Sequence, residues 1–532
     1  MFDYVVIGGG SAGCVLASRL TEDPTVRVAL LEAGGVDSSA VIHCPAGLAL
    51  MAKMPKLNWR FDTVPQPGLN DRRGYQPRGK VLGGSSSVNA MVYIRGQHAD
   101  YDAWAADGNP GWGFDDLLPY FKRSENNARG ADAWHGSGGP LQVQDLLQPN
   151  RGSGLFVQAA QQAGHALNRD FNGAHQEGVG PYQVTHRGGE RCSAAKAYLG
   201  LALGRPNLKV ITGAHATRIL FDGERANGVE YRVGNTRQQV MARGEVLLSA
   251  GALQSPQLLM LSGIGPADHL QALGIAVRQD QPGVGAQLHD HVDVVQVVDA
   301  PTAKDLFGLS FSGLVQALQG ILEWRRHRTG MLTTNFAEAG GFIRSSPDRP
   351  APDLQLHFVI GKLVDHGRKP VFGHGYSCHV CLLDPESRGS LRLASPDPLA
   401  APLIDPAFLQ APGDLVRLVR GFRLMRNILQ QPALAGLGGR ELAMSAGAQT
   451  DEQIAQYIRN YADTIYHPVG SCRMGPGARD VVDADLRVKG VPGLRVVDAS
   501  IMPRVVSGNT NAPTMAIAEK ASDLIKASRR AA

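Results

Sequence analysis

The start of the chain alternates apolar runs with a glycine-rich turn. Residues 2–7 are apolar except for Asp3, which predicts a buried strand. A turn from Gly8 to Gly13 follows, and residues 14–20 and 26–31 then predict a helix and a second buried strand. The order strand, glycine turn, helix, strand is typical of a dinucleotide-binding unit.

Each glycine of the turn has a physical task in such a unit. Gly8 allows the tight turn, Gly10 lets the backbone approach a pyrophosphate, and Gly13 permits close packing of helix on strand. Glu32, at the end of the second strand, can accept hydrogen bonds from ribose hydroxyls. The unit alone does not distinguish FAD from NAD. The expected nucleotide contacts are Gly8, Gly10, Ser11, Ala12, Gly13, Glu32 and Ala33.

Later segments have a different periodicity. Residues 354–359 and 391–393 alternate apolar and polar positions, which predicts half-buried strands of an antiparallel sheet. Residues 494–498 predict one more buried strand, whose final Asp498 could approach the cofactor or cap a helix. Residues 514–520 are strongly helical in pattern, with Pro513 suited to the first turn.

The segment 311–328 predicts an amphipathic helix with a basic end. Its apolar side chains recur at helical spacing, and it ends in Trp324 followed by Arg325, Arg326, His327 and Arg328. Two interpretations remain open. The helix packs on the core of a substrate domain, or it contacts a membrane surface near a quinone entrance.

Composition narrows the class of protein. With 532 residues, 43% hydrophobic and 19% charged, the chain predicts a soluble globular protein of more than one domain. The net charge of +5 is not gathered into a basic stripe, so we expect no nucleic-acid partner. No signal-peptide pattern precedes the first strand and no apolar run reaches 18 residues. We therefore expect a cytoplasmic protein, with peripheral contact at the inner face of the membrane as an option.

The six cysteines do not form a disulfide framework. Cys378 and Cys381 stand three residues apart in an apolar strand, so their thiols should point to opposite faces. We expect buried thiols and no metal site.

Two further glycine-rich segments identify a family resemblance. Residues 78–96, from Arg78 through Gly83-Gly84 to Gly96, resemble the first signature of the glucose-methanol-choline (GMC) oxidoreductases, and residues 249–265 resemble the second. Residues 282–285 with Asp290 and His291, residues 387–389 and residues 467–518 are also similar. The similarity spans nearly the whole chain in family order and is closest to choline-dehydrogenase-like and other alcohol dehydrogenases.

The resemblance implies an α/β fold, α+β overall, in which a Rossmann-like FAD-binding domain of discontinuous segments carries an antiparallel-sheet substrate domain. Residues 1–297 would form the first part of the FAD domain, with inserted lid and substrate-site segments near 45–70 and 159–190. Residues 298–459 would form the substrate domain, and residues 460–532 would return to the FAD domain with the catalytic residues.

The resemblance also implies FAD as the cofactor. Some family members attach FAD covalently through a histidine at the position of Val88, so we expect dissociable FAD here. Asn89 should lie near the flavin ring or cap the glycine loop. The further implied cofactor contacts are Gly83, Ser87, Asn89, Ala90, Val92, Ala216, Ala250, Asp498, Ala499, Ala512 and Thr514.

Catalysis is implied at two late segments. His467 matches the family's general base, and Asn511 matches the partner position, where an amide can hydrogen-bond a developing alkoxide. His291 is interpreted as structural. Tyr466 and Glu338 are tentative substrate contacts, although Glu338 could equally be a buried carboxylate paired with an arginine.

The implied reaction is oxidation of a primary alcohol to an aldehyde with hydride transfer to FAD. The resemblance favours a quinone or another carrier as the electron acceptor. An alcohol oxidase that uses O₂, an FAD-containing hydroxynitrile lyase and a non-catalytic flavin-binding scaffold remain alternatives.

Overall fold

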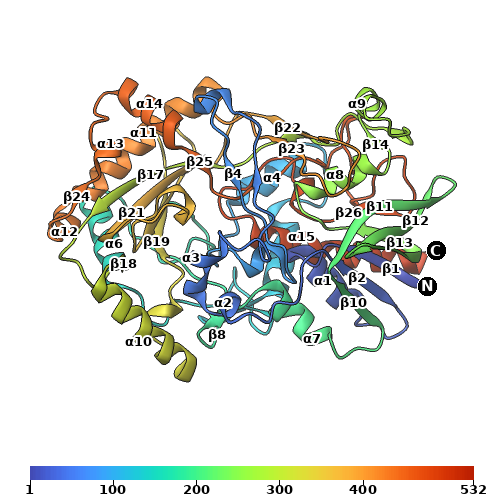
Figure 1. Cartoon of the computed structure of the whole chain (residues 1–532), viewed down its shortest axis with the longest axis horizontal. Coiled ribbons are helices and arrows are strands. Elements are labelled where there is room, and N and C mark those ends of the chain that lie inside the picture. Colours follow the sequence, from blue (N-terminus) through green and yellow to red (C-terminus); the bar gives the residue numbers. More distant parts are fainter. Residues whose placement is uncertain (532) are drawn as a thin grey trace.

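The computed structural model describes residues 1–531, which form two large sheets, several small ones and the helices around them (Figure 1). The first sheet contains the predicted dinucleotide-binding unit. β1 (Phe2–Ile7) lies between β2 (Val28–Glu32) and β13 (Thr236–Leu248), and all three run parallel. β10 (Leu208–Thr212) adds beside β2, and β26 (Leu494–Val496) adds beside β13, as the late apolar run predicts.

The same sheet continues as an antiparallel meander through β12 (Arg225–Val233) and β11 (Ala214–Asp222). Two helices, α1 (Ser11–Leu20) and α15 (Asn511–Ala531), pack against each other beside the parallel strands (Figure 1). The Arg19 guanidinium pairs with the buried Glu519 carboxylate at 2.8 Å. This packing brings the start of the last helix to the first glycine turn.

The second sheet has eight strands, and its described pairs are all antiparallel. It contains β24 (Arg440–Glu441), β17 (Val292–Asp299), β21 (Gly373–Leu382), β20 (Leu354–Val359), β19 (Ala337–Ile343) and β7 (Gly178–Pro181), with β18 (Gly308–Leu309) and β25 (Asp463–Thr464) at its margins. The fold class is thus confirmed. β17 spans the predicted domain boundary at 297/298 and belongs wholly to this sheet, which also takes strands from 178–181 and 463–464.

One face of the second sheet is covered by α6 (Arg151–Gln162), α11 (Pro412–Leu429) and α14 (Asp451–Tyr461). Side chains alternate along each strand, so Leu354, Leu356 and Phe358 of β20 pack into this core. Cys378 lies in the same core and Cys381 in a different apolar cluster, and all six cysteines are free and buried. The opposite face of the sheet is turned to a cavity.

Shorter elements complete the chain. The other helices are α2 (Ala40–His43), α3 (Leu48–Met51), α4 (His98–Ala106), α5 (Phe114–Ser124), α7 (Gly200–Ala202), α8 (Gln254–Leu261), α9 (Ala267–Ala272), α12 (Pro432–Ala435) and α13 (Ala443–Ala446). The other strands are β3 (Phe61–Asp62), β4 (Tyr75–Gln76), β5 (Glu125–Asn127), β6 (Leu141–Val143), β8 (His186–Arg187), β9 (Glu190–Arg191), β14 (Ile264–Gly265), β15 (Gln279–Asp280), β16 (Ala286–Leu288), β22 (Gly389–Arg392) and β23 (Leu403–Asp405). The predicted strand at 391–393 overlaps β22, which pairs with β16 and β23 and not with the second sheet.

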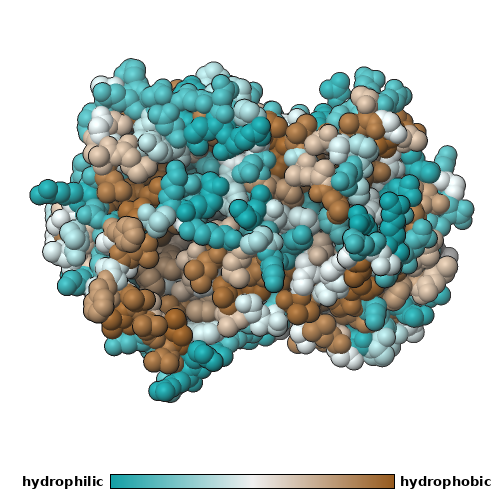
Figure 2. Space-filling model, viewed as in Figure 1, coloured by the Kyte–Doolittle hydropathy of each residue, from teal (hydrophilic) through white to brown (hydrophobic). Residues whose placement is uncertain are grey.

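Most of the apolar face of α10 (Phe311–His327) does not pack on the core, so the first interpretation is wrong for this face, although Trp324 enters a buried apolar cluster. Only Gly320 and Trp324 of this helix are buried. Phe311 is 86% exposed and Leu318 55% exposed. Figure 2 shows apolar side chains gathered over this helix at the lower left of the molecule. In residues 1–531 no helix combines the length and the apolar composition needed to cross a bilayer.

Candidate active site

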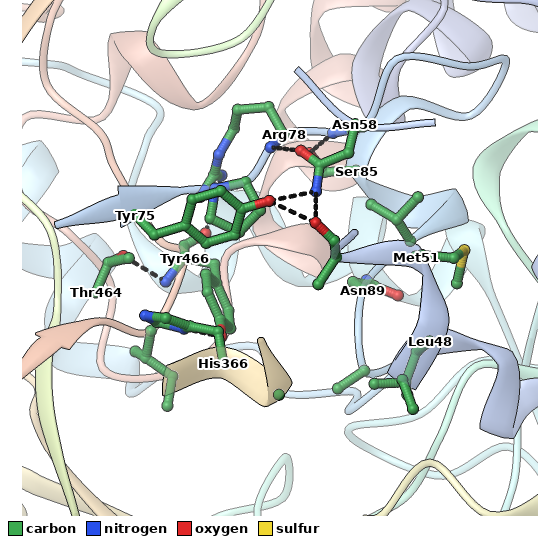
Figure 3. A pocket seen from close by; sticks show the side chains of 18 of the residues that line it. Leu48, Met51, Asn58, Tyr75, Arg78, Ser85, Asn89, His366, Thr464 and Tyr466 are labelled. Atoms are coloured by element: carbon green, nitrogen blue, oxygen red, sulfur yellow. Dashed lines mark hydrogen bonds between the residues drawn. The ribbon is translucent and has the colours of Figure 1, made fainter. Parts of the chain in front are cut away.

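A cavity of about 1580 Å³ is lined by residues from both large sheets. It extends from the glycine turn after β1 to the free face of β17, β20 and β21. Figure 3 shows part of its wall, where Tyr75, His366 and Tyr466 lie across from Leu48 and Met51. The cavity therefore joins the predicted nucleotide site to the predicted catalytic residues.

Two positions of the glycine turn, Gly8 and Gly13, require glycine. Gly8 has a φ of +99°, and a Cβ on it would lie 2.4 Å from the carbonyl oxygen of Ser249. A Cβ on Gly13 would lie 1.9 Å from the carbonyl oxygen of Gly8, so α1 packs directly on the turn. A Cβ on Gly84 would lie 2.7 Å from the Cα of Gly10, so the two glycine segments touch across the cradle.

The carboxylate of Glu32 organises the backbone around this cradle. Its two oxygens accept hydrogen bonds from the N–H groups of Gly9, at 2.9 Å, and Gly34, at 2.7 Å. Burial raises the pKa of Glu32 to about 7, although both hydrogen bonds and Lys80 oppose this rise. Glu32 also lines the cavity, so it can hold the turn and face a ribose.

Most predicted site residues lie at the cavity wall. The lining includes Gly8, Gly10, Ser11, Ala12, Glu32, Ala33, Asn89, Ala90, Val92, Ala216, Ala250, Tyr466, His467, Asp498, Ala499, Asn511 and Thr514. Asp498 lies at the cavity wall and also caps a helix, while its approach to the cofactor stays a prediction. It accepts hydrogen bonds from the N–H groups of Gly251, at 2.9 Å, and Ser500, at 2.8 Å, and so caps the short helix that follows it.

A few predicted cofactor contacts lie behind the wall. Gly13 packs the helix, Gly83 forms a turn with a φ of +88°, and Ala512 lies in the apolar core. The Ser87 hydroxyl is buried and donates to the carbonyl oxygen of Leu82 at 2.7 Å. These residues do not line the cavity themselves but shape the backbone that does, so their contact with the cofactor stays a prediction.

Glu338 is also not part of the cavity wall. Its carboxylate accepts from the N–H group of Asn150 at 2.6 Å and from the hydroxyls of Ser153, at 2.8 Å, and Thr334, at 2.6 Å. Glu338 is thus a buried carboxylate, as one interpretation expected, but its partners are a backbone N–H group and two hydroxyls in place of an arginine. Its role is to join the start of α6 to β19.

His467 lies on the loop after β25, and its hydrogen bonds fix its tautomer. The Nε2 atom of His291 lies 3.0 Å from the carbonyl oxygen of Leu383, which can only accept, so Nε2 carries a proton. Burial lowers the pKa of His291 to about 4, so its Nδ1 carries none. That Nδ1 lies 3.0 Å from the Nδ1 of His467. His467 must donate there, which leaves its Nε2 unprotonated.

The amide beside this Nε2 belongs to Asn509, not to the predicted Asn511. The Nδ2 atom of Asn509 lies 3.2 Å from the Nε2 of His467. The Oδ1 atom of Asn511 instead accepts from the Ser11 hydroxyl at 2.7 Å, in the first glycine turn. Both asparagines line the cavity. The match to the family motif located the right segment of the chain. The asparagine of this segment that contacts His467 lies two residues before the predicted one.

His467 is held as a neutral base. Burial lowers its pKa well below the usual value, and the nearby His291, His357 and Arg78 lower it further. His291 contacts the imidazole directly, so it is a positioning residue and not only a structural one. The Asp290-His291 motif singled out this residue, but only the tertiary contact reveals its partner.

Tyr466 connects the catalytic loop to the segment 362–372, which lines the cavity. Its hydroxyl bonds to the Nδ1 of His366, and the Nε2 of His366 lies 3.0 Å from the carboxylate of Asp463. The Tyr466 backbone has a φ of +77°, an uncommon conformation for a residue other than glycine. His366 belongs to no motif that could have been recognised in the sequence.

The residues present fit an FAD cofactor. The cavity is continuous from the glycine cradle, past Glu32 and Asn89, to His467. Val88 lies in its wall, and a valine side chain has no atom that can bond to a flavin. The glycine turn, the Glu32 carboxylate and His467 thus line one cavity, as a single extended dinucleotide cofactor requires.

Comparisons with known proteins find relatives that match nearly the whole chain. The N-terminal model of the GMC oxidoreductases matches residues 2–293, and the C-terminal model matches residues 385–518. An alcohol dehydrogenase [acceptor] of Pseudomonas putida is 49% identical over 99% of this chain and 96% of its own length. The mitochondrial choline dehydrogenase of Mus musculus is 46% identical over 99% of this chain and 89% of its own length. A solved FAD-dependent oxidoreductase from Chaetomium thermophilum has a TM-score of 0.89 and 29% identity, with all of both chains covered.

Proposed function

Because the chain belongs to the GMC oxidoreductases and is an FAD-dependent enzyme that oxidises CH–OH groups, we propose that it converts a primary alcohol to an aldehyde with His467 as the general base. The observation that carries this proposal is the unprotonated Nε2 of His467, which faces the cavity beside Asn509. A hydroxyl group that reaches this nitrogen can give up its proton to it.

The chain supplies what the proton transfer needs. The alcohol hydroxyl takes the place of the Asn509 amide at Nε2, and the Asn509 N–H group then donates to the alcohol oxygen. His291 keeps the proton of His467 on Nδ1, so the base stays oriented. When bound, FAD supplies the acceptor for the hydride of the substrate carbon. The start of α15 lies at the cavity, where its positive end favours negative charge.

A direct test is to mix the purified yellow protein without oxygen with a panel of primary alcohols. We expect the visible absorption of the flavin to bleach as aldehyde forms. Aldehyde and cyanide released from a cyanohydrin without bleaching would indicate a lyase instead. If no alcohol or cyanohydrin reacts, the remaining interpretation is a flavin-binding scaffold without catalytic activity. Return of the colour with a quinone, but not with O₂, supports our proposal that a quinone or similar carrier is the acceptor.

We also propose that FAD is bound noncovalently, since Val88 occupies the position where some relatives carry a histidine. Acid precipitation should release the yellow colour into the supernatant. Colour that stays in the pellet contradicts this proposal.

The exposed face of α10 is proposed to contact an anionic membrane surface at the inner face of the membrane. On this face Leu314 is 58% exposed and Leu322 56% exposed, and the nearby Phe372 is 78% exposed. Leu314 and Phe372 also line the cavity. At the end of the helix, Arg325 and Arg326 are exposed and form no ion pair within residues 1–530. Apolar side chains beside free cations are typical of an interfacial helix. A quinone dissolved in the bilayer would then have direct access to the cavity.

This contact can be measured by cosedimentation with vesicles of phosphatidylglycerol and phosphatidylcholine. We expect the double variant Leu314→Gln/Leu318→Gln to bind at least tenfold more weakly, because burying each leucine contributes about 1.5–3 kcal/mol. Arg325→Glu/Arg326→Glu should remove the preference for anionic over neutral vesicles. The control Leu201→Gln/Leu203→Gln alters two leucines of similar exposure outside the cavity wall and should bind as the parent does. Equal binding of all variants contradicts the proposal.

A further inference from the structure

Three adjacent strands of the second sheet present polar side chains to the cavity. His357 of β20 is paired with His379 of β21, and His379 is paired in turn with Val295 of β17. Asp293 stands two residues before Val295, so it faces the same side of the sheet. All four residues line the cavity. None of them belongs to a sequence motif, and only the strand register brings them together.

Two ring nitrogens in this group have no partner. The Nδ1 of His357 and the Nε2 of His379 are buried and make no hydrogen bond within residues 1–530. His357 as a whole is only 5% exposed. The other nitrogen of His379, Nδ1, lies 2.5 Å from the Asp293 carboxylate and therefore donates to it. A buried polar atom left without a partner costs about 1–3 kcal/mol, so a polar group that entered beside the two rings and paired with these nitrogens would recover that cost.

We propose that His357 and His379 bind a second hydroxyl group of the substrate, so that the preferred substrate class is a primary alcohol with another hydroxyl at its far end. This inference rests on the proposed alcohol oxidation and names the substrate class of that same cavity.

A hydroxyl group suits both nitrogens because it can donate to one ring and accept from the other. Burial lowers the pKa of His357 to about 3, and His379 and His291 lower it further, so its ring is neutral. A quaternary ammonium fits poorly by comparison. It has no proton to donate to an imidazole, and the Asp293 carboxylate beside the pair is already engaged by His379.

The strand geometry sets the distance between the two ends of the substrate. Gln355 precedes His357 by two residues on β20, and its Nε2 lies 3.3 Å from the Oδ1 of Asn509, the amide next to His467. Two residues of a strand span about 7 Å. The second hydroxyl should therefore stand about that far from the reacting one, which a terminal diol of moderate chain length achieves.

The test compares n-hexanol with its terminal diol. The diol has two equivalent ends, which alone doubles its kcat/KM. Beyond this statistical factor, we expect kcat/KM of the parent enzyme to be about tenfold higher for the diol. Most of the difference should lie in KM. His379→Leu should reduce this preference to about the statistical factor by weakening the diol alone. His379→Gln, which keeps hydrogen-bonding atoms near the same place, should restore part of it. Val295→Ala is the control, since it changes the adjacent cavity volume without removing a hydrogen bond.

Equal kcat/KM for both alcohols, or a diol preference that persists in folded His379→Leu and His357→Leu variants, would overturn the subsite and leave alcohol oxidation intact. If neither alcohol bleaches the flavin, the proposed function has failed. The subsite is then tested by affinity alone, from the change in flavin absorption as each alcohol binds. A diol affinity no greater than that of hexanol overturns it there too.

Discussion

Replacing His467 with alanine is expected to lower kcat for alcohol oxidation by about 10²- to 10⁴-fold, the usual contribution of a positioned general base. The physical reason is that the proton of the alcohol then has no acceptor at the cavity wall next to Asn509. FAD should remain bound, because the hydrogen bonds that Glu32 accepts from Gly9 and Gly34 at the glycine turn do not involve the His467 side chain. Stopped-flow measurement of anaerobic flavin bleaching isolates this step from reoxidation.

The control for this variant is His165→Ala, which removes a histidine outside the cavity wall and should leave kcat unchanged. A loss of less than about tenfold in His467→Ala would mean that the typical base contribution is absent. The pH profile adds an independent check. Because burial lowers the pKa of His467, the neutral base persists as the pH falls below about 6.5, and activity is lost only below that value. An acid limb above about 6.5 would point to another group.

The second large effect is expected from Gly8→Ala. An alanine there must adopt a φ near +99°, which costs on the order of 1–3 kcal/mol, and its Cβ would lie 2.4 Å from the Ser249 carbonyl oxygen. The backbone must shift, and the turn then no longer fits a pyrophosphate. We expect a protein purified with little or no FAD, measured as the ratio of flavin to protein absorbance.

Gly251→Ala separates the two causes. Gly251 also lines the cavity and has a φ of +86°, but a Cβ on it would meet nothing within 4 Å. In this variant alanine must still adopt a positive φ, but its Cβ collides with no protein atom. We therefore expect it to retain most of its FAD. Similar loss of FAD in both variants would show that the backbone angle, and not the close approach of Gly8 to Ser249, is decisive. Circular dichroism of each variant identifies loss of folding as opposed to loss of cofactor.

The interpretation of α10 shows where a sequence pattern is not enough. Apolar residues at helical spacing predict one apolar face, but they do not determine what that face contacts. In the structure only Gly320 and Trp324 of this helix are buried. The exposed face is therefore a property of how the helix is docked on the rest of the chain, and not of its own residues.

The local features of this protein follow from its sequence. The glycine turn at residues 8–13, the strand before it and Glu32 after the next strand are adjacent in the chain, and their chemistry depends on backbone conformations that neighbouring residues impose. The match of residues 78–96 and 249–265 to family signatures likewise needs no tertiary information, and it identified the cofactor and the reaction class.

The tertiary structure alone decided which side chains meet. Asn509 and not Asn511 contacts His467, His291 sets its tautomer, Glu338 lies behind the cavity wall, and His357 stands beside His379. These contacts join residues up to 188 positions apart in the chain. A hydrogen bond requires its partners to be within about 3.2 Å, and a shift of one or two residues in strand or loop register removes it. The sequence by itself determined the glycine cradle and the family, while the packing of the two sheets determined the contacts of His467 and the shape of the cavity.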